Sequence, residues 1–283
     1  MSTGRGDDGS DRDEPLVPGR LPLRGSDAPT PPGVVRVRAQ GAPRREAPTT
    51  AGPDVRTSRV ALSRERIAGA LRSVESKREA PHLHLGATID LGPCVALLGE
   101  RSASAFPGDG VEVEDVLLAA CAGALASCPA LNGRFAGDAI ETWEEIHLAC
   151  SVAVGQSLAW PVLRSPGRLP IDALSALRRE LARRVRAGEA KADDEKGSTF
   201  SVALLGELGI ESAYEVIRPP QAAILAIGTP VRRAVVRGHG IEADWVVSLG
   251  LSCDRRIVEE PAAARFLAEL RRRVEQPMLL LGD

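Results

Sequence analysis

The segment that most constrains the fold is residues 249–281, where a strand-like run ending at Asp254 is followed by a helix and a short apolar tail. Pro261 fits the first turn of a helix, and Glu259 and Glu260 just before it complement the positive end of the helix dipole. The apolar residues of this helix recur at helical spacing: Ala263, Leu267, Leu270 and Val274. The segment therefore predicts a strand followed by a helix with one continuous apolar stripe.

Two parts of the chain differ in composition. Residues 1–57 contain nine of the 21 prolines, no aromatic residue and no lysine. Such a segment buries too little apolar surface to offset the entropy of ordering it, so we expect it to be disordered. Residues 58–283 carry the regular apolar patterns, and only 3% of the whole chain is aromatic. We therefore expect one folded domain over residues 58–283, with a core of aliphatic side chains.

Charge, apolar runs and cysteines exclude several classes of protein. A net charge of −2 gives no reason to expect nucleic-acid binding. The longest apolar run, residues 116–128, is about half as long as a membrane span, and the chain starts without the apolar stretch of a signal peptide. The five cysteines lack the spacing of a zinc site or a disulfide framework: Cys94, Cys121, Cys128, Cys150 and Cys253. We expect a cytoplasmic protein with no membrane or metal site.

The remaining patterns predict a mixed α/β domain. The expected elements are a helix that Ser63 caps, a strand over residues 82–90, helices over residues 116–127 and 171–187, and paired strands over residues 231–237 and 241–251. His239 lies between two glycines in the turn of that last pair, so we expect it to be a turn residue. His82 and His84 face the same side of their strand, but no third residue at a fixed spacing completes a metal site.

The helix over residues 171–187 allows two interpretations. Its apolar stripe leaves five arginines on the other faces: Arg178, Arg179, Arg183, Arg184 and Arg186. Five arginines suit a ligand with phosphate groups, such as coenzyme A. Acidic residues are interleaved with them, which is more typical of a solvated helix face: Asp172, Glu180 and Glu189.

Three segments together resemble the catalytic domain of the dihydrolipoamide acyltransferases of 2-oxo acid dehydrogenase complexes. They are residues 199–206, residues 219–228 and the motif at residues 254–260. The family motif reads Asp-His-Arg, two apolar residues, then Asp-Gly, and its His is the general base that takes a proton from a thiol. In this chain Asp254 and Arg256 are retained. Arg255 stands in the position of the base, and Glu259 in that of the second Asp.

The resemblance also implies an oxyanion donor, which this chain lacks. In the family a serine hydroxyl in the strand equivalent to residues 199–206 holds the oxyanion, and that position is Ala203 here. Arg255 keeps its proton at any accessible pH and cannot act as a base. We therefore expect a catalytically impaired scaffold or regulatory subunit. The alternative is an active acyltransferase that moves an acyl group between coenzyme A and a thiol, amine or hydroxyl acceptor. Its base would be rearranged, and His147 is the candidate for that base.

The resemblance finally sets expectations for fold and assembly. The family fold is a chloramphenicol-acetyltransferase-like two-layer α/β sandwich, a mixed sheet flanked by helices. It forms trimers in which each site takes its base from one subunit and its hydroxyl from the neighbour. We expect a homo-trimer with contacts from the tail at residues 277–281, and mixed oligomers with an active relative are allowed. The first lysine is Lys77, so residues 1–57 contain no lysine that could carry a lipoyl group. A coenzyme A thioester remains the possible substrate.

Overall fold

The computed structural model describes residues 58–99, 110–191 and 193–278. Residues 1–57, which we expect to be disordered, lie outside the described residues. Most of the apolar tail at residues 277–281 also lies outside them. Within them no helix is long and apolar enough to cross a membrane.

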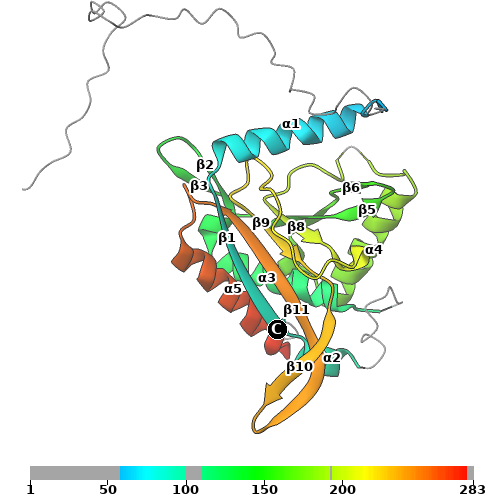
Figure 1. Cartoon of the computed structure of the whole chain (residues 1–283), viewed down its shortest axis with the longest axis vertical. Coiled ribbons are helices and arrows are strands. Elements are labelled where there is room, and N and C mark those ends of the chain that lie inside the picture. Colours follow the sequence, from blue (N-terminus) through cyan, green and yellow to red (C-terminus); the bar gives the residue numbers. More distant parts are fainter. Residues whose placement is uncertain (1–57, 100–109, 192, 279–283) are drawn as a thin grey trace, which may run out of the picture. The chain divides into compact units, whose positions relative to one another are not determined.

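A mixed sheet of seven strands forms the centre of the fold (Figure 1). Its order is β1 (His82–Asp90), β11 (Gly240–Asp254), β9 (Ala223–Ile227), β8 (Phe200–Leu204), β4 (His147–Cys150) and β7 (Val162–Arg164), and β10 (Val231–Arg237) pairs with β11. β4, β8 and β9 are parallel to one another, whereas β1, β7 and β10 pair antiparallel with their neighbours. The predicted strand over residues 82–90 and the predicted hairpin are confirmed.

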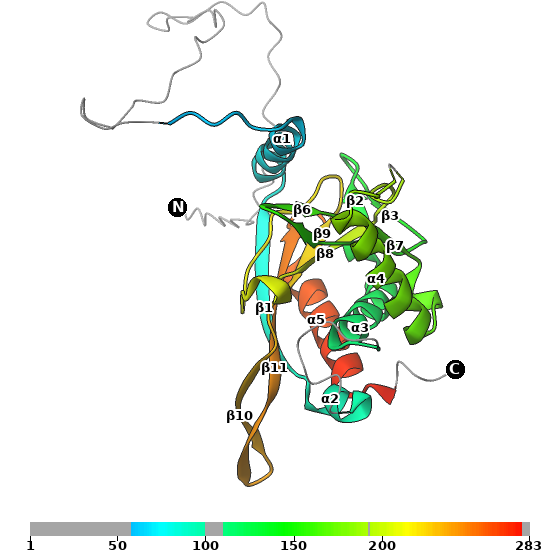
Figure 2. The ribbon, with the colours of Figure 1, turned by 90° about the vertical axis from the view of Figure 1, so that its right-hand side faces the viewer.

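One face of the sheet is covered by helices. They are α2 (Gly92–Leu98), α3 (Val113–Ser127), α4 (Ile171–Arg186) and α5 (Glu260–Glu275), and Figure 2 shows α3 and α5 on the same side of β11. The apolar stripe of α5 is buried in the main core, as its spacing predicts. Phe200 and Phe266 are the fully buried aromatic residues of the main core, whose other buried members are aliphatic residues and cysteines. The expected two-layer α/β sandwich is confirmed.

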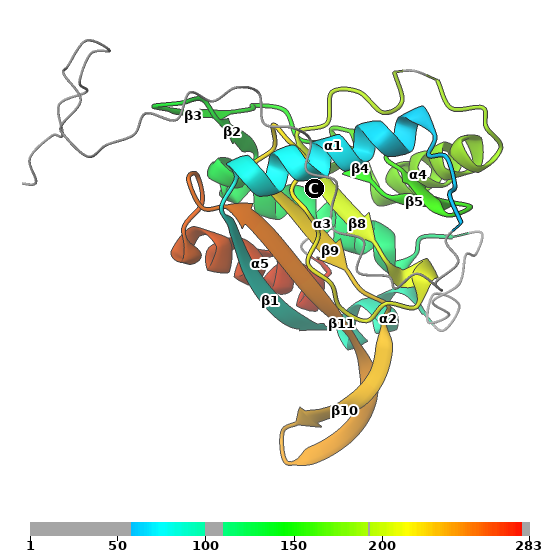
Figure 3. The ribbon, with the colours of Figure 1, turned by 45° about the horizontal axis from the view of Figure 1, so that its top comes forward.

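The first helix, α1 (Arg64–Glu79), begins where the sequence predicts (Figure 3). The Ser63 hydroxyl accepts a hydrogen bond from the backbone N–H of Arg66 at 3.2 Å. The apolar positions Ile67, Leu71 and Val74 share one stripe, but their side chains are 45%, 65% and 64% exposed. This stripe has no cover among the described residues.

The other face of the sheet is covered in part by the chain segment between β8 and β9, which includes η4 (Gly206–Leu208). The backbone of Ala213 passes so close to Gly250 that a Cβ atom there would overlap with its carbonyl. The Tyr214 hydroxyl would collide in the same way with a Cβ at Gly86, which is paired with Gly250 across β1 and β11. The two glycines therefore provide the flat strip on which this segment lies.

Residues 147–159 form short strands instead of one long strand. Ser151 separates β4 from β5 (Val152–Val154), which pairs antiparallel with β6 (Ser157–Ala159). The Ser151 hydroxyl accepts from the Leu204 N–H at 2.8 Å and so holds the break against the end of β8. The remaining short elements are η2 (Pro129–Leu131), β2 (Gly133–Phe135), β3 (Ile140–Thr142) and η3 (Pro166–Arg168).

Candidate functional site

The retained motif residues lie at the end of β11, the long strand of the sheet. Asp254 is buried, and its carboxylate accepts hydrogen bonds from Nε and Nη2 of Arg256 at 3.0 and 2.6 Å. The guanidinium of Arg256 also lies 4.3 Å from the ring centroid of Phe135. This hydrogen-bonded carboxylate raises the pKa of Arg256 above its usual value. The pair fixes the turn that follows β11, so the framework of the motif is intact.

Arg255 lies on the outside of this framework. Its side chain is 58% exposed, and its Nη2 donates to Oε1 of Glu260 at 2.9 Å. The Arg255 backbone N–H donates to the carbonyl of Pro81, which fixes the main chain here. The position predicted to hold the base thus carries a permanently protonated group in a surface ion pair. Glu259 is the N-cap residue of α5 and makes no side-chain cap hydrogen bond.

Ala203 is fully buried on the sheet face opposite the helices. Along β8, Phe200 and Val202 point into the main core, while Ala203 packs in a separate cluster with Leu205 and Ala226. Trp160 lies against this second cluster. Ala203 therefore offers no hydrogen-bond donor on the face where the family serine would stand.

Ser201 occupies the same face but does not replace that serine. Its hydroxyl donates to Oε1 of Gln221 at 2.7 Å, and the Gln221 amide donates to Ser198 at 2.9 Å. The hydroxyl of Ser201 is thus already engaged in a buried network, two residues or roughly 6.6 Å along the strand from Ala203.

Within one chain the two halves of the predicted site are far apart. Asp254 and Ala203 share a face of the sheet, but β9 lies between their strands and Ala203 is level with Gly250. Two strand spacings and four residues along β11 give a separation of roughly 16 Å. One chain therefore does not bring these two positions together around a single reacting carbonyl.

His147, the candidate substitute base, is not beside the motif. It lies on β4, three strand spacings or roughly 14 Å from β11. Its Nδ1 accepts a hydrogen bond from the backbone N–H of Ser165 at 3.1 Å. In that tautomer Nε2 carries the proton, so the ring serves a structural hydrogen bond rather than a base at this site.

His84, which the sequence suggested only as a metal ligand, lies nearer to the motif than His147. His84 on β1 pairs across with Ser252 of β11, and its Nδ1 lies 2.9 Å from the Ser252 hydroxyl. Both ring nitrogens of His82, by contrast, are hydrogen-bonded. Nδ1 bonds to the carbonyl of Ala80, and Nε2 accepts from the backbone N–H of Ile217. Burial, together with the charges of Lys77 and His82, lowers the pKa of His84, so the ring is neutral at pH 7. The alternation of His82 and His84 was the sequence signal for this pair.

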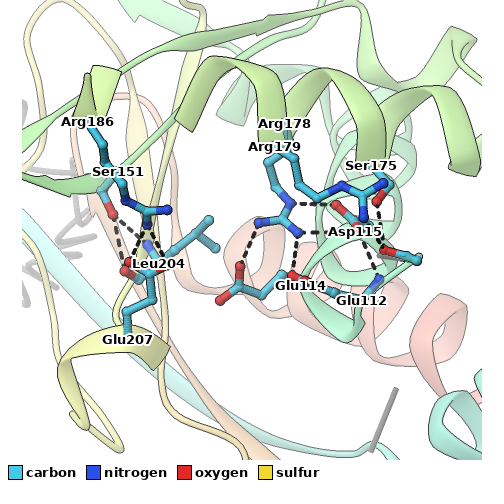
Figure 4. A network of polar contacts seen from close by, with 11 residues as sticks. Glu112, Glu114, Asp115, Ser151, Ser175, Arg178, Arg179, Arg186, Leu204 and Glu207 are labelled. Carbon is cyan, nitrogen blue, oxygen red and sulfur yellow. Dashed lines mark hydrogen bonds and ion pairs between the residues drawn. The ribbon is translucent and has the colours of Figure 1, made fainter. Parts of the chain in front are cut away.

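The helix arginines lie beside a cavity of about 500 Å³ at the carboxyl ends of β4 and β8. Arg178, only 12% exposed, donates to three carboxylates at the start of α3 (Figure 4). The donor–acceptor distances are 2.5 Å to Asp115, 3.1 Å to Glu114 and 2.5 Å to Glu112. The expectation of a solvated face is therefore wrong for Arg178, because its guanidinium ties α4 to the N-terminus of α3. It holds for Arg183, which is 56% exposed.

Three carboxylates contact the guanidinium of Arg178 in this cluster. Burial raises the pKa of Glu114. Burial alone would lower the pKa of Arg178, but its hydrogen bond with Asp115 and the neighbouring charges raise it above the usual value.

All five cysteines are free and buried, and burial raises the pKa of Cys94, Cys150 and Cys253 to about 12. They are therefore protonated and poor nucleophiles. Among the described residues, no three histidine, cysteine or acidic side chains lie close enough to hold a metal ion.

Comparison with known proteins identifies relatives over most of the chain. Residues 54–282 match the family model of the 2-oxoacid dehydrogenases acyltransferase (catalytic domain). The dihydrolipoyllysine-residue acetyltransferase component of the pyruvate dehydrogenase complex of Zymomonas mobilis is 32% identical over 225 residues, which are 79% of this chain and 51% of that protein. The mitochondrial protein of this name from Schizosaccharomyces pombe is 29% identical over 78% of this chain and 46% of its own length. The chain thus spans about half the length of the curated relatives it matches.

Solved structures share the fold. The dihydrolipoamide acetyltransferase of Azotobacter vinelandii superposes with a TM-score of 0.74 at 26% identity, covering 80% of this chain and 95% of that one. The roles of a serine, a histidine and an asparagine in the catalytic mechanism of that enzyme have been investigated. The serine and the histidine are as far apart in sequence as Ala203 and Arg255, and the histidine and the asparagine as far apart as Arg255 and Glu259.

Proposed function

The chain belongs to the family of 2-oxoacid dehydrogenase acyltransferase catalytic domains, and we propose that it retains the fold and assembly of that family but has lost acyl transfer. It would then act as a scaffold or regulatory subunit. The observation that carries the proposal is Arg255, which stands at the position of the base as an exposed guanidinium paired with Glu260. A guanidinium cannot accept the proton of a substrate thiol.

The environment of Ala203 supports the same proposal. A tetrahedral oxyanion needs a donor at the position of the serine, and Ala203 is enclosed by apolar neighbours. The hydroxyl of Ser201 is held by Gln221 and would have to leave that network to reach the substrate. Both parts of the catalytic pair are therefore absent from the places where the family has them.

The separation of the two half-sites supports assembly as a homo-trimer. With roughly 16 Å between the positions of Asp254 and Ala203 in one chain, a complete site combines faces of two copies. A related solved structure, 26% identical with a TM-score of 0.74, is the cubic core of a pyruvate dehydrogenase multienzyme complex. The exposed stripe of α1 is a further apolar surface that a second copy could cover. In a mixed oligomer with an active relative, a subunit of this chain would disable the sites on both of its sides.

Restoring the catalytic set is expected to produce weak transfer. The variant Ala203→Ser, Arg255→His, Glu259→Asn reproduces the residues of the Azotobacter enzyme on an intact Asp254–Arg256 framework. We expect it to transfer acetyl from acetyl coenzyme A to dihydrolipoamide at least about tenfold faster than wild type, while Arg255→His alone gains little because the groups act as one unit.

Arg255→Lys is the matched control, because it shortens the side chain and keeps the charge. Circular dichroism and calorimetry with acetyl coenzyme A should accompany the assay. A folded triple variant that binds coenzyme A and gains no transfer would contradict the assignment of these three positions.

A second candidate function is an active acyltransferase that uses His84 as its base. The favouring observation is the pair of His84 and Ser252: when Nδ1–H donates to the hydroxyl, Nε2 is left to accept a proton, and no described residue occupies it. His84 lies roughly 8 Å from Asp254 across β1 and β11. The thiol proton would pass to Nε2, the sulfur would attack the thioester carbonyl, and the proton would return to the departing coenzyme A thiolate.

This candidate predicts which histidine supports residual transfer. Any rate above buffer should fall about a hundredfold or more in His84→Ala, the loss expected for a positioned base, and should remain unchanged in His147→Ala. Because burial lowers the pKa of His84, the rate should decline only at acidic pH, below the usual value of 6.5. Equal rates in both alanine variants would exclude His84 as the base.

A further inference from the structure

Arg218 is a partly buried cation that has no anionic partner among the described residues. Its Cζ atom lies 4.3 Å from the ring centroid of Trp160, on the sheet face opposite the helices. In the part of the chain that the structure describes, no carboxylate lies within ion-pair distance of this guanidinium. The carboxylate that acts on it from farther away is Glu195, whose Oε1 accepts a hydrogen bond from the Trp160 backbone N–H at 3.2 Å.

Other partly buried arginines are paired. Arg178 has three carboxylates, Arg184 has Asp194, Arg237 has Asp90 and Asp244, and Arg273 has Glu269. This is the usual arrangement, because an unpaired charge away from water is unfavourable. Arg218 departs from it.

A second guanidinium adds to the positive potential. Arg72, on the exposed side of α1, acts on Arg218 from a segment more than a hundred residues away in the sequence. Burial first, and then the charge of Arg72, lower the pKa of Arg218 to about 10. Among the described residues, no carboxylate within contact distance of Arg218 offsets these effects.

The stacking prepares Arg218 for an oxyanion. An indole ring under one face of the guanidinium holds its plane and leaves the N–H groups at its edge free to donate. Such a planar edge matches the two oxygens of a carboxylate or phosphate group. Trp160 also packs against the cluster of Ala203, so the bound group would lie beside the position of the family serine.

We propose that Arg218, held on Trp160, is a binding site for a carboxylate or phosphate group. The site goes beyond the proposed function, because it requires neither a base nor acyl transfer. The oxyanion has two possible sources, a free small anion or an acidic side chain of a second copy of the chain.

The test uses inorganic phosphate as the probe, with the full chain at constant ionic strength. Tryptophan fluorescence and the thermal midpoint should both respond to phosphate, and Arg218→Gln should raise the apparent Kd at least tenfold. Trp160→Phe should remove the fluorescence change. Arg168→Gln is the matched control, because Arg168 is 73% exposed and paired with Glu145, and it should behave as wild type.

Sedimentation equilibrium tests whether the anion is an acidic side chain of a second copy of the chain. If a second copy provides the carboxylate, phosphate gives no saturable response and Arg218→Gln weakens self-association at least tenfold, whereas Arg168→Gln does not. If Arg218→Gln fails to fold, Arg218→Lys keeps the charge without the planar edge and should weaken the same property by a smaller factor. The proposal is overturned if the Arg218 variants match wild type both in their response to phosphate and in self-association.

Discussion

The purified protein is expected to transfer acetyl groups from acetyl coenzyme A to dihydrolipoamide at about one ten-thousandth of the rate of the Azotobacter vinelandii enzyme, or less. A positioned base typically contributes about a hundred- to ten-thousandfold, and one oxyanion donor about a hundred- to a thousandfold. Arg255 cannot supply the first effect and Ala203 cannot supply the second. The lower ends of the two ranges already multiply to about ten-thousandfold.

The measurement is a thiol-release assay run with both proteins at the same subunit concentration and pH. Branched acyl thioesters should be tested in parallel, since the acyl group is open. Turnover within about a hundredfold of the Azotobacter enzyme would contradict the loss of acyl transfer, and the His84→Ala variant would then become the decisive comparison.

The largest expected effect on stability comes from Arg178. In Arg178→Met the buried carboxylate of Asp115 and those of Glu112 and Glu114 lose their shared cation. Removing one partner of a buried ion pair typically costs about 3–5 kcal/mol. For a domain of this size that corresponds to a fall of roughly 10 °C in Tm. Thermal and urea unfolding of the full chain measure it.

The pH dependence of the free energy of unfolding shows whether the lost charge causes the destabilisation of Arg178→Met. Without Arg178 the carboxylates are expected to have pKa values in the folded protein well above those in the unfolded chain. The folded state then binds more protons, so the free energy of unfolding of the variant should rise as the pH falls from 8 toward 5. Burial already raises the pKa of Glu114 in the wild type, in the same direction.

Arg183→Met is the matched control on the same helix. Arg183 is paired with Glu180 and Glu189 on the surface, so its loss should cost far less stability than the loss of Arg178 and show no recovery in acid. Equal losses in the two variants, or a loss in Arg178→Met that does not depend on pH, would show that packing of the side chain matters rather than its charge.

Local patterns in the sequence were sufficient to locate the main helices and strands. A helix start depends on residues within one turn, so Ser63 and Pro261 mark α1 and α5 correctly. The two-residue period of β1 placed His82 and His84 on one face. The family motif at Asp254 and Arg256 identified the fold through resemblance. The helix starts and the two-residue period of the strand are determined by neighbours in the chain.

Only the tertiary structure decided what the charged side chains do. The sequence shows that Arg178 and Arg183 lie outside the apolar stripe of α4, but the position of α3 decides that one of them is buried among carboxylates. His84 meets Ser252, 168 residues away, and Arg218 meets Trp160 only through the packing of separate segments. The energy of a charge depends on its burial and on partners that are distant in the sequence, and a local pattern contains neither.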